Sequence, residues 1–327
     1  MSKVAVIGAT TWGNTLGRLL SSKGTTVSVW ASSEAKAQEL RRCHLLKTES
    51  FESLSFTSNP NEALDLAEFV IFAVPAQRMR QNARLASPYL DAPMVMISAS
   101  KGLEAETSKR MSEVIAEETA HMSSERICAL SGPNLSAEIA KGLPATSVVA
   151  GRDIEVDGRV QRLFDSPSFS VFISDDVVGV EICGALKNVI AIGAGILDGL
   201  DLGNNAKAAF ITFGWNEVVS IGLALGAKPR TFYGLAGLGD LIATGNSPLS
   251  RNHYVGYELG KGRSLADITV SMPHVAEGID TAMAAQHLGI KLGLKTPIIS
   301  LVYSVLFESM APIEIATRFK SVLRPEQ

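Results

Sequence analysis

Short, continuous apolar runs separated by helical stretches mark the first half of the chain. The first run, Val4-Ala5-Val6-Ile7, ends at Gly8 and is followed by a helix with apolar residues on one side. Such runs are typical of parallel strands buried on both faces of a sheet. The pattern predicts strands over residues 4–7, 27–30, 69–74, 94–97, 127–130 and 146–149. Because strands and helices alternate, we predict a doubly wound parallel α/β sheet.

The pattern changes after Asp176, where apolar residues recur at helical spacing. Glycine, proline and asparagine mark the ends of the expected elements. The sequence predicts helices over residues 177–198, 204–225, 250–260, 275–288, 297–307 and 312–323. We therefore expect two domains, an α/β domain over residues 1–176 and an all-α C-terminal domain over residues 177–327.

Composition narrows the classes of function. The chain has 327 residues and a net charge of −3, so it has no electrostatic footprint for nucleic acid. Its three cysteines and five histidines show neither a disulfide framework nor metal-ligand spacing, so we expect no metal site. The N-terminus has no signal-peptide pattern, which favours a cytoplasmic protein. Glu181 and Lys187 interrupt the apolar stretch 177–200, which favours a buried core helix over stable membrane insertion.

Lys187 places a charge within the apolar run 182–192. A long cation with small neighbours suggests a lysine that reaches into a cavity, where burial lowers its pKa and suits it to proton transfer near neutral pH. Two other interpretations stay open, a lysine whose amine extends to the surface and a structural ion pair beneath a close helix crossing. At helical spacing, the neighbours of this lysine are Gly184, Ala191, Ala194 and Gly195.

The segment Gly8-Ala9-Thr10-Thr11-Trp12-Gly13 lies in the first strand-to-helix turn. In dinucleotide-binding domains the pyrophosphate meets a helix N-terminus at this turn. The fingerprint of such turns has three glycines, and this chain has the first and third, Gly8 and Gly13. Thr10 stands at the second position, where it either shifts a pyrophosphate outward or offers it a hydroxyl. The turn indicates a dinucleotide-binding domain, with a plain tight turn as the alternative.

The end of the second strand bears on the choice of cofactor. NAD-specific sites place an acid there for the ribose hydroxyls. Here the positions are Ala31-Ser32-Ser33, and we expect Glu34 in the first turn of the next helix. No acid is placed to repel a 2′-phosphate, and Lys36 or Arg41 could attract one. We predict that NADPH is accepted.

Two further segments follow predicted strands, at the edge where ligands bind in open α/β sheets. Lys101, in Ser100-Lys101-Gly102, is a candidate for meeting an anionic substrate, with a solvated loop lysine as the alternative. The segment Ser131-Gly132-Pro133-Asn134 combines a glycine with polar residues and suits contact with a ligand. Its alternative is an ordinary turn that leads to a helix cap.

Polar residues in the C-terminal half complete the set of candidates. Asp240, in Gly237-Leu238-Gly239-Asp240, either caps a helix or holds the ammonium of Lys187. The segment 247–252 begins a helix with hydroxyl caps and Arg251, and backbone N–H groups plus an arginine make a phosphate clamp. A surface salt bridge is the alternative for Arg251. Glu277 near a helix start is, taken alone, a match to the helix dipole.

Together these segments resemble the NAD(P)-dependent glycerol-3-phosphate dehydrogenase family of the bacterial type. The similar segments run in family order across essentially the whole chain, and are Ser100–Glu104, Ser131–Pro133, Gly184–Ala191, Ala236–Leu241, Ser250–Asn252 and Val275–Gly278. The resemblance implies a Rossmann-like first domain, NAD or NADP as cofactor, and a homodimer. It also implies a small phosphorylated substrate, because the family reduces dihydroxyacetone phosphate to sn-glycerol 3-phosphate for glycerophospholipid synthesis.

By matching position, the resemblance implies that Lys187 is the catalytic general acid/base, with Asp240 and Asn188 beside it. It places substrate contacts at Lys101, Gly132, Asn134, Lys187, Asp240, Thr244, Ser250, Arg251 and Asn252. It places cofactor contacts at Gly8, Thr10, Thr11, Trp12, Gly13, Ser32, Lys101, Ser136, Arg251, Val275 and Glu277.

Three departures from the family pattern fall on candidate site residues. Thr10 replaces a glycine, Asn134 replaces a hydroxyl residue, and Ser32 stands where relatives often have a basic residue. Thr10 and Asn134 leave an alternative open, a catalytically weak dinucleotide sensor or scaffold. Within the enzymes, a related β-hydroxyacid or 6-phosphogluconate-type dehydrogenase is a further alternative.

Overall fold

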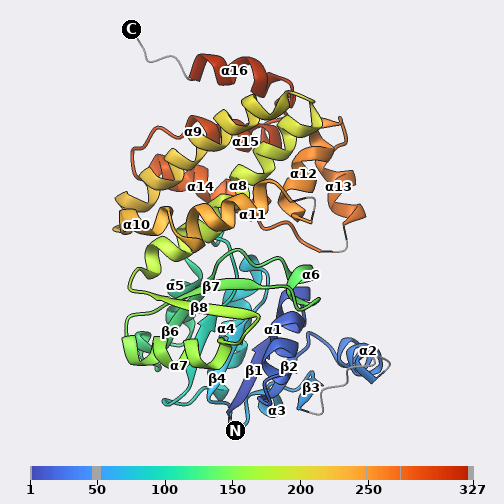
Figure 1. The fold of residues 1–327 in the computed structure, drawn as a ribbon, viewed down its shortest axis with the longest axis vertical. Coiled ribbons are helices and arrows are strands. Elements are labelled where there is room, and N and C mark those ends of the chain that lie inside the picture. The colour runs from blue at the N-terminus through green and yellow to red at the C-terminus, as the bar shows by residue number, and fades with distance from the viewer. Residues whose placement is uncertain (1, 46–52, 248, 273, 323–327) are drawn as a thin grey trace. The chain divides into compact units, whose positions relative to one another are not determined.

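The computed structural model describes residues 2–45, 53–247, 249–272 and 274–322 (Figure 1). The chain divides into two compact units. Unit 1 is Met1–Ser100 with Met111–Val177, and unit 2 is Lys101–Arg110 with Val178–Gln327. The segment 101–110, which the sequence assigns to the first domain, thus clusters with the helical unit. Pro248 in the expected helix cap and residue 323 of the last expected helix lie outside the described residues.

Unit 1 contains an eight-stranded sheet in the order β3-β2-β1-β4-β5-β6-β7-β8. All neighbouring strands are parallel except β6 and β7, which pair antiparallel. The doubly wound α/β prediction is confirmed, with this one antiparallel pair as a difference. The strands are β1 (Lys3–Ile7), β2 (Thr26–Trp30), β3 (Leu54–Thr57), β4 (Phe69–Phe72), β5 (Val95–Ser98), β6 (Ile127–Ser131), β7 (Ala145–Ala150) and β8 (Phe169–Ser174).

The sequence prediction missed β3 and β8, and both are edge strands of the sheet. An edge strand is less covered than a central one, so its sequence alternates between apolar and polar residues. In β8 the alternation runs Phe169-Ser170-Val171, and Phe172 is exposed. Continuous apolar runs therefore mark the central strands but not these two edge strands.

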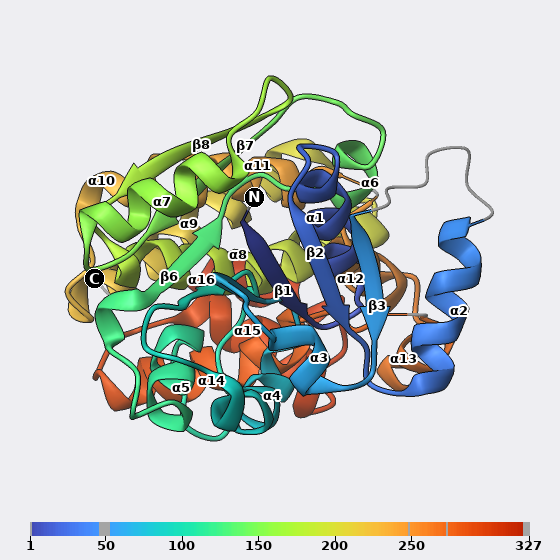
Figure 2. The ribbon, with the colours of Figure 1, turned by 90° about the horizontal axis from the view of Figure 1, so that it is seen from below.

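Helices cover both faces of this sheet. Alternate residues of β1 enter different core clusters: Val4 and Val6 pack on the face of α1 and α7, and Ala5 and Ile7 on the face of α4 and α5. Figure 2 shows α3, α4 and α5 on one side of the strands and α7 on the other. The helices are α1 (Thr11–Ser21), α2 (Glu34–Leu45), α3 (Pro60–Leu64), α4 (Met79–Ala86), α5 (Met111–Glu118), α6 (Ser136–Ile139) and α7 (Ile154–Phe164), with 3₁₀ turns η1 (Ala76–Arg78), η2 (Ser87–Tyr89) and η3 (Ser124–Arg126).

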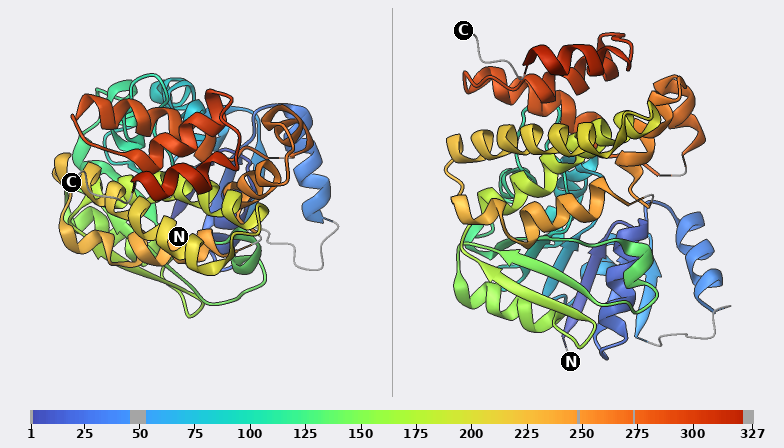
Figure 3. Two further views of the ribbon diagram at one scale, coloured as in Figure 1. Left: turned by 90° about the horizontal axis from the view of Figure 1, so that it is seen from above. Right: turned by 45° about the horizontal axis from the view of Figure 1, so that its top comes forward.

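Unit 2 is built from helices, coloured yellow-green to red in Figure 3. The six expected helices are present within a few residues of their predicted bounds, and three short helices and a π-helical turn were not expected. The elements are α8 (Val177–Gly199), α9 (Gly203–Ala224), α10 (Pro229–Phe232), the π-helical turn η4 (Leu235–Gly239), α11 (Asp240–Gly245), α12 (Arg251–Gly260), α13 (Leu265–Ser271), α14 (Gly278–Lys291), α15 (Pro297–Phe307) and α16 (Glu314–Val322).

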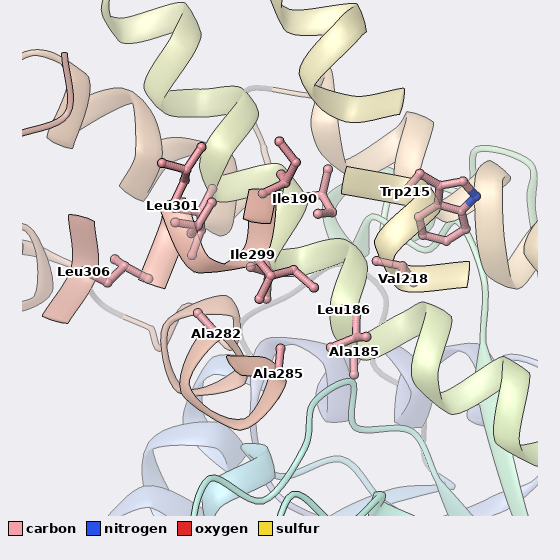
Figure 4. Close-up of a cluster of buried hydrophobic side chains, with 14 of the residues drawn as sticks. Ala185, Leu186, Ile190, Trp215, Val218, Ala282, Ala285, Ile299, Leu301 and Leu306 are labelled. Carbon is pink, nitrogen blue, oxygen red and sulfur yellow. The ribbon is translucent and has the colours of Figure 1, made fainter. Parts of the chain in front are cut away.

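Helix α8 is the central helix of unit 2. All its residues are buried except Val177, Val178 and Asp198. By length and composition alone α8 could cross a membrane, but 89% of its most apolar window is buried inside the fold. Figure 4 shows side chains of α8, α9, α14 and α15 meeting around it, so α8 is the core helix that the sequence predicts.

A buried carboxylate holds two of these helices together. Glu217 of α9 accepts hydrogen bonds from the backbone N–H groups of Ile298 (2.7 Å) and Ile299 (2.9 Å), in the first turn of α15. It thereby caps a helix that lacks a side-chain cap of its own. Burial nevertheless raises the pKa of this carboxyl to about 7, more than the two hydrogen bonds lower it.

We predict that Glu217 makes the stability of unit 2 fall as the pH rises from about 4.5 to about 7. In this window the folded state holds a proton that the unfolded state has released, so the free energy of unfolding decreases with pH. Glu217→Gln cannot titrate. The stability of the parent relative to this variant should therefore drop by roughly 2–3 kcal/mol between pH 5 and pH 7.5. Urea unfolding at both pH values measures this difference, and a constant difference would contradict the assignment.

Candidate active site

Lys187 and Asp240 form a buried ion pair in unit 2. Lys187 is 5% exposed and Asp240 1% exposed. The ammonium Nζ lies 2.6 Å from Oδ1 of Asp240, and it also donates to Oγ1 of Thr244. Asp240 and Thr244 are one turn apart on α11, so both face the lysine. Of the two roles considered for Asp240, the structure places its carboxylate on the ammonium of Lys187.

A second lysine shares the same carboxylate. Nζ of Lys101 lies 2.7 Å from Oδ2 of Asp240, so each carboxylate oxygen carries one ammonium. Lys101 is 17% exposed and therefore less buried than Lys187. The cluster carries one net positive charge, which suits an anionic ligand.

The electrostatic surroundings lower the pKa of Lys187 to about 8. Burial is the largest cause, because the charged form loses its hydration. Asp240 raises the pKa, and the positive charges of Lys101 and Arg251 lower it. The effect of burial on the pKa of Lys187 thus outweighs that of Asp240, a comparison that the sequence alone leaves open. Lys187 can therefore hold or release a proton near neutral pH.

The start of α11 is set by the π-helical turn before it. Gly237 within this turn has a non-helical backbone, and a Cβ there would lie 2.4 Å from the carbonyl oxygen of Phe232. Only glycine fits so close an approach. The Gly-Leu-Gly-Asp segment is therefore a tight helical turn that places Asp240 at the first position of α11.

Asn188 and Asn252 connect three helices beside the lysine. Nδ2 of Asn252 donates to Oδ1 of Asn188 (2.8 Å), and Oδ1 of Asn252 accepts from the backbone N–H of Gly278 (2.9 Å). Nδ2 of Asn188 donates to the carbonyl of Gly184 on the previous turn (3.3 Å). The carboxamide of Asn252 thus joins α8, α12 and α14. Because this side chain is used within the fold, the backbone N–H of Asn252, in the first turn of α12, is the group best suited to a ligand.

Ser250 and Arg251 stand at the start of α12. The hydroxyl of Ser250 accepts from the backbone N–H of His253 (3.2 Å) and caps the helix. The exposed side chain of Arg251 donates through Nη1 to the carbonyl of Val275 (2.7 Å). Glu277 follows at the N-cap position of α14, where its backbone carbonyl accepts from the Thr281 hydroxyl. Arg251 has further donors in its guanidinium for an anion.

Glycines let α8 and α12 touch backbone to backbone. A Cβ on Gly195 would lie 2.1 Å from the carbonyl oxygen of His253, and one on Gly256 would lie 1.9 Å from that of Ile192. One turn further on, Gly199 and Gly260 make the same kind of contact. The expectation that small residues near Lys187 line a cavity is therefore wrong for Gly195, because α12 occupies this space.

In unit 1 the β1–α1 turn has the form of a dinucleotide loop. Gly8 has φ +109°, and a Cβ on Gly13 would lie 2.0 Å from the carbonyl oxygen of Gly8, so both positions require glycine. The hydroxyl of Thr10 caps α1 by accepting from Gly13 N (3.0 Å) and donates to the carbonyl of Ala73 (2.8 Å). Its single proton is thus used within the fold, which favours an outward shift of a pyrophosphate over a hydroxyl donated to it. Trp12 donates through Nε1 to the carbonyl of Ala99 (3.1 Å).

The segment after β6 is held against β7. Asn134 donates through Nδ2 to the carbonyl of Thr146 (2.8 Å) and accepts from the Ser147 hydroxyl (3.2 Å). A Cβ on Gly132 would lie 2.9 Å from the same Thr146 oxygen. Asn134 therefore anchors this turn to β7, and the absence of a side chain at Gly132 allows the two segments to approach closely. Half-buried Ser136 begins α6.

The residues after β2 carry both signs of charge. Ser32 is exposed, and Glu34 begins α2 as expected. Arg41 donates to Oε1 of Glu34 (2.9 Å), and Lys36 pairs with Glu39 (2.9 Å). Each of the two cations expected to attract a 2′-phosphate is thus paired with an acid of the same helix.

Comparison with known proteins adds to this geometry. The family model of the NAD-dependent glycerol-3-phosphate dehydrogenase N-terminus matches residues 3–157, and that of the C-terminus matches residues 176–317. The chain belongs to this family. Its cofactor is NAD or NADP, because the matched N-terminal half contains the dinucleotide loop described above.

Individual relatives resemble the chain over nearly its whole length. A glycerol-3-phosphate dehydrogenase (NAD(P)+) from Dehalococcoides mccartyi is 50% identical, covering 97% of this chain and 90% of the relative. One from Geobacter metallireducens is 43% identical, with 97% of each covered. The crystal structure of glycerol-3-phosphate dehydrogenase from Coxiella burnetii superimposes with a TM-score of 0.92 at 29% identity, covering 99% of each chain.

The structure brings together six of the predicted residues by direct hydrogen bonds, all within unit 2, and they are Lys101, Lys187, Asn188, Asp240, Thr244 and Asn252. A close helix crossing was one of the interpretations left open for Lys187, and the structure shows one between α8 and α12; the matching Gly-x-x-x-Gly spacing at 195–199 and 256–260, which predicts its partner, was not used. Sequence reasoning missed that Lys101 pairs with Asp240, for which the sequence carries no signal. Among the described residues, no group of three His, Cys, Asp or Glu could hold a metal ion.

We predict that Asp240→Asn destabilises the enzyme because it leaves the buried ammonium of Lys187 without a counter-charge. Removing one partner of a buried ion pair costs about 3 kcal/mol in the free energy of unfolding. Adding Lys187→Met to this variant should recover part of the loss, since the most buried ammonium is then removed and only that of Lys101, which is 17% exposed, remains. Urea unfolding at pH 7 measures both. Asp201→Asn, at an exposed ion pair with Lys261, is the control and should change little. An Asp240→Asn variant as stable as the parent would sink the argument.

Proposed function

We propose that this enzyme reduces dihydroxyacetone phosphate to sn-glycerol 3-phosphate with NADH or NADPH, reversibly. The observation that carries the proposal is the buried Lys187–Asp240 pair, with Lys101 on the same carboxylate, in a chain that belongs to the glycerol-3-phosphate dehydrogenase family. The product supplies the backbone of glycerophospholipids.

Lys187 is the proposed general acid. Reduced nicotinamide, when bound, supplies a hydride to the carbonyl carbon of the substrate. The ammonium of Lys187 then gives its proton to the oxygen that gains negative charge. In the reverse direction the neutral amine accepts the hydroxyl proton. Asp240 and Thr244 hold the amine in a fixed position, which supports proton transfer between this amine and the substrate oxygen.

The phosphate of the substrate is proposed to bind at the start of α12. Backbone N–H groups of its first turn and the guanidinium of Arg251 are suited to a dianion. Lys101 adds a second positive charge beside Asp240. Ser250 would contribute by ordering this turn, since its hydroxyl already caps α12. Asn252 would act through its backbone, and Gly132 and Asn134 stay predicted contacts.

The cofactor is proposed to lie on the β1–α1 turn. Gly8 and Gly13 let the end of β1 and the start of α1 pack closely, and the start of this helix offers backbone N–H groups to a pyrophosphate. The further cofactor contacts that we propose, from the family pattern, are Thr10, Thr11, Trp12, Ser32, Lys101, Ser136, Arg251, Val275 and Glu277. Acceptance of NADPH is supported by the lack of an acid at Ala31-Ser32-Ser33.

The alternative of a weak sensor or scaffold is not favoured, because the family's lysine and aspartate form a complete ion-paired cluster. Related dehydrogenases that act on carboxylate substrates are not favoured either, since the relatives of this chain have the glycerol-3-phosphate name. We further propose a cytoplasmic homodimer without a nucleic-acid partner. Cys43, Cys128 and Cys183 form no disulfide among the described residues, which supports the reducing compartment, and the family resemblance supports the dimer.

We predict that Lys187→Ala lowers kcat for dihydroxyacetone phosphate by about two to four orders of magnitude, because the general acid is lost. In the parent enzyme, glycerol 3-phosphate oxidation needs the neutral amine, so its rate should rise with pH and level off above about 8. Ketone reduction needs the ammonium and should fall above the same pH. Absorbance of the reduced nicotinamide follows both directions.

Lys261→Ala is the control for this variant, because Lys261 forms an exposed ion pair with Asp201. It should keep the activity and the pH profile of the parent. Near-normal turnover of a folded Lys187→Ala enzyme would refute the role of the amine. A parent enzyme that binds NADH or NADPH without reducing the ketone would instead favour the sensor.

We predict that Arg251→Ala raises KM for dihydroxyacetone phosphate by about tenfold to a hundredfold, the loss of one or two charge-assisted hydrogen bonds. The KM for dihydroxyacetone, which has no phosphate, should change little. Arg251→Lys keeps the charge and loses the planar fork, so it should fall between the two. Steady-state kinetics on both substrates decide the matter, and equal changes would show that Arg251 does not contact phosphate.

A further inference from the structure

A ten-residue hairpin delivers Lys101 to Asp240. It spans Lys101–Arg110 and connects β5 to α5, which both belong to unit 1, yet it clusters with unit 2. Leu103 and Arg110 form an antiparallel bridge across it. At its tip, Ser108 takes a left-handed backbone with φ +57° and donates its N–H to the carbonyl of Glu104 (2.8 Å). Lys101 therefore sits at one end of a closed loop whose other end is Arg110.

Besides the contacts of Lys101 with Asp240 and Asn188, contacts of Leu103, Ser108 and Arg110 fasten this hairpin to the helices of unit 2. Leu103 is fully buried in the core cluster of that unit. The hydroxyl of Ser108 donates to the carbonyl of Ala284 on α14 (3.2 Å). Nη1 of Arg110 lies 2.7 Å from Oε2 of Glu181 on α8. The ion pair thus ties the hairpin to the helix that carries Lys187.

The ion pair between Arg110 and Glu181 is largely removed from solvent. The two side chains are 11% and 6% exposed, in contrast to those of the exposed pair Lys261–Asp201. Desolvation offsets most of the attraction in such a pair, so its net contribution to stability is small. Its geometry is nevertheless strict, because either charge left alone in this place is costly. A contact of this kind fixes position more than it adds stability.

We propose that Arg110 and Glu181 are positioning residues that hold Lys101 on Asp240, beside Lys187. The inference rests on the proposed function, in which Lys101 and Lys187 serve the same substrate. The positive charge of Lys101 lies beside Lys187 and opposes its protonation. If the hairpin loosens, this charge withdraws and Asp240 no longer shares its carboxylate with a second ammonium, while Arg251 stays in place. Both changes favour the ammonium form, so the amine would release its proton at higher pH.

The first test is Glu181→Gln, with Arg110→Lys as the conservative variant. Glu181→Gln should raise KM for dihydroxyacetone phosphate by about tenfold, because a displaced Lys101 would lose one charge-assisted contact with the substrate. It should also move the pH at which glycerol 3-phosphate oxidation levels off to a higher value. Arg110→Lys keeps the charge and should show smaller changes of the same sign. The matched control is Glu258→Gln, because Glu258 pairs with Arg263 at 2.7 Å in the same unit but with more exposure. This control should behave like the parent.

The double variant Arg110→Met with Glu181→Gln separates position from stability. Both charges of the Arg110–Glu181 pair are removed in it, so neither is left without the other and its thermal midpoint should return towards that of the parent. If the pair positions Lys101, the altered KM and pH profile persist in this stable protein. Their return to parent values together with stability would overturn the proposal, as would unchanged kinetics in Glu181→Gln.

A measurement that needs no turnover distinguishes the positioning role of Arg110 and Glu181 from the proposed function of the enzyme. Acetylation of Lys101 by a water-soluble amine reagent, followed by mass spectrometry of its peptide, reports how firmly Asp240 holds this amine. Labelling should be several-fold faster in Glu181→Gln than in the parent, with Lys261 as the internal reference. Unchanged labelling would overturn the positioning role even if the enzyme reduced dihydroxyacetone phosphate. Faster labelling in a protein without that activity would sustain it and count against the proposed function alone.

Discussion

One carboxylate shared by two ammonium groups is the interaction on which the rest of this site depends. Asp240 gives the buried ammonium of Lys187 a counter-charge, and Lys101 binds the other oxygen of the same carboxylate. Burial lowers the pKa of Lys187 most, Asp240 raises it, and the positive charges of Lys101 and Arg251 lower it. The opposing effects leave an amine that exchanges its proton within the physiological range.

The packing of unit 2 serves this arrangement. The central helix α8 supplies Lys187 and Asn188, and the glycine contacts draw α12 against it. The two asparagines then link α8, α12 and α14, so that the start of α12 is held at a set place beside the lysine. Positioning of this kind is what a reaction between small, multiply charged molecules requires from a protein.

Much of the fold could be predicted from the sequence, because burial on both faces leaves a plain apolar pattern. The six predicted strands and six predicted helices exist, and the misses fall where that pattern weakens, at the edge strands β3 and β8 and at the short helices. The pairing of Lys187 with Asp240 was one of two roles considered for the aspartate. The pairing of Lys101 with it could not be predicted, because the hairpin joins residues far apart in the chain through tertiary contacts alone.

The membership of the hairpin in unit 2 limits how this protein can be divided. A cut near residue 177, where the α/β pattern ends, leaves a helical fragment that contains Asp240 and Lys187 but not Lys101. Exchange of N-terminal halves between relatives at that point would also exchange the hairpin, and with it one of the two cations on the carboxylate. A chimera that keeps the site intact would need to take residues 101–110 from the same parent as the helical half. The residues that form this site are therefore discontinuous in the sequence.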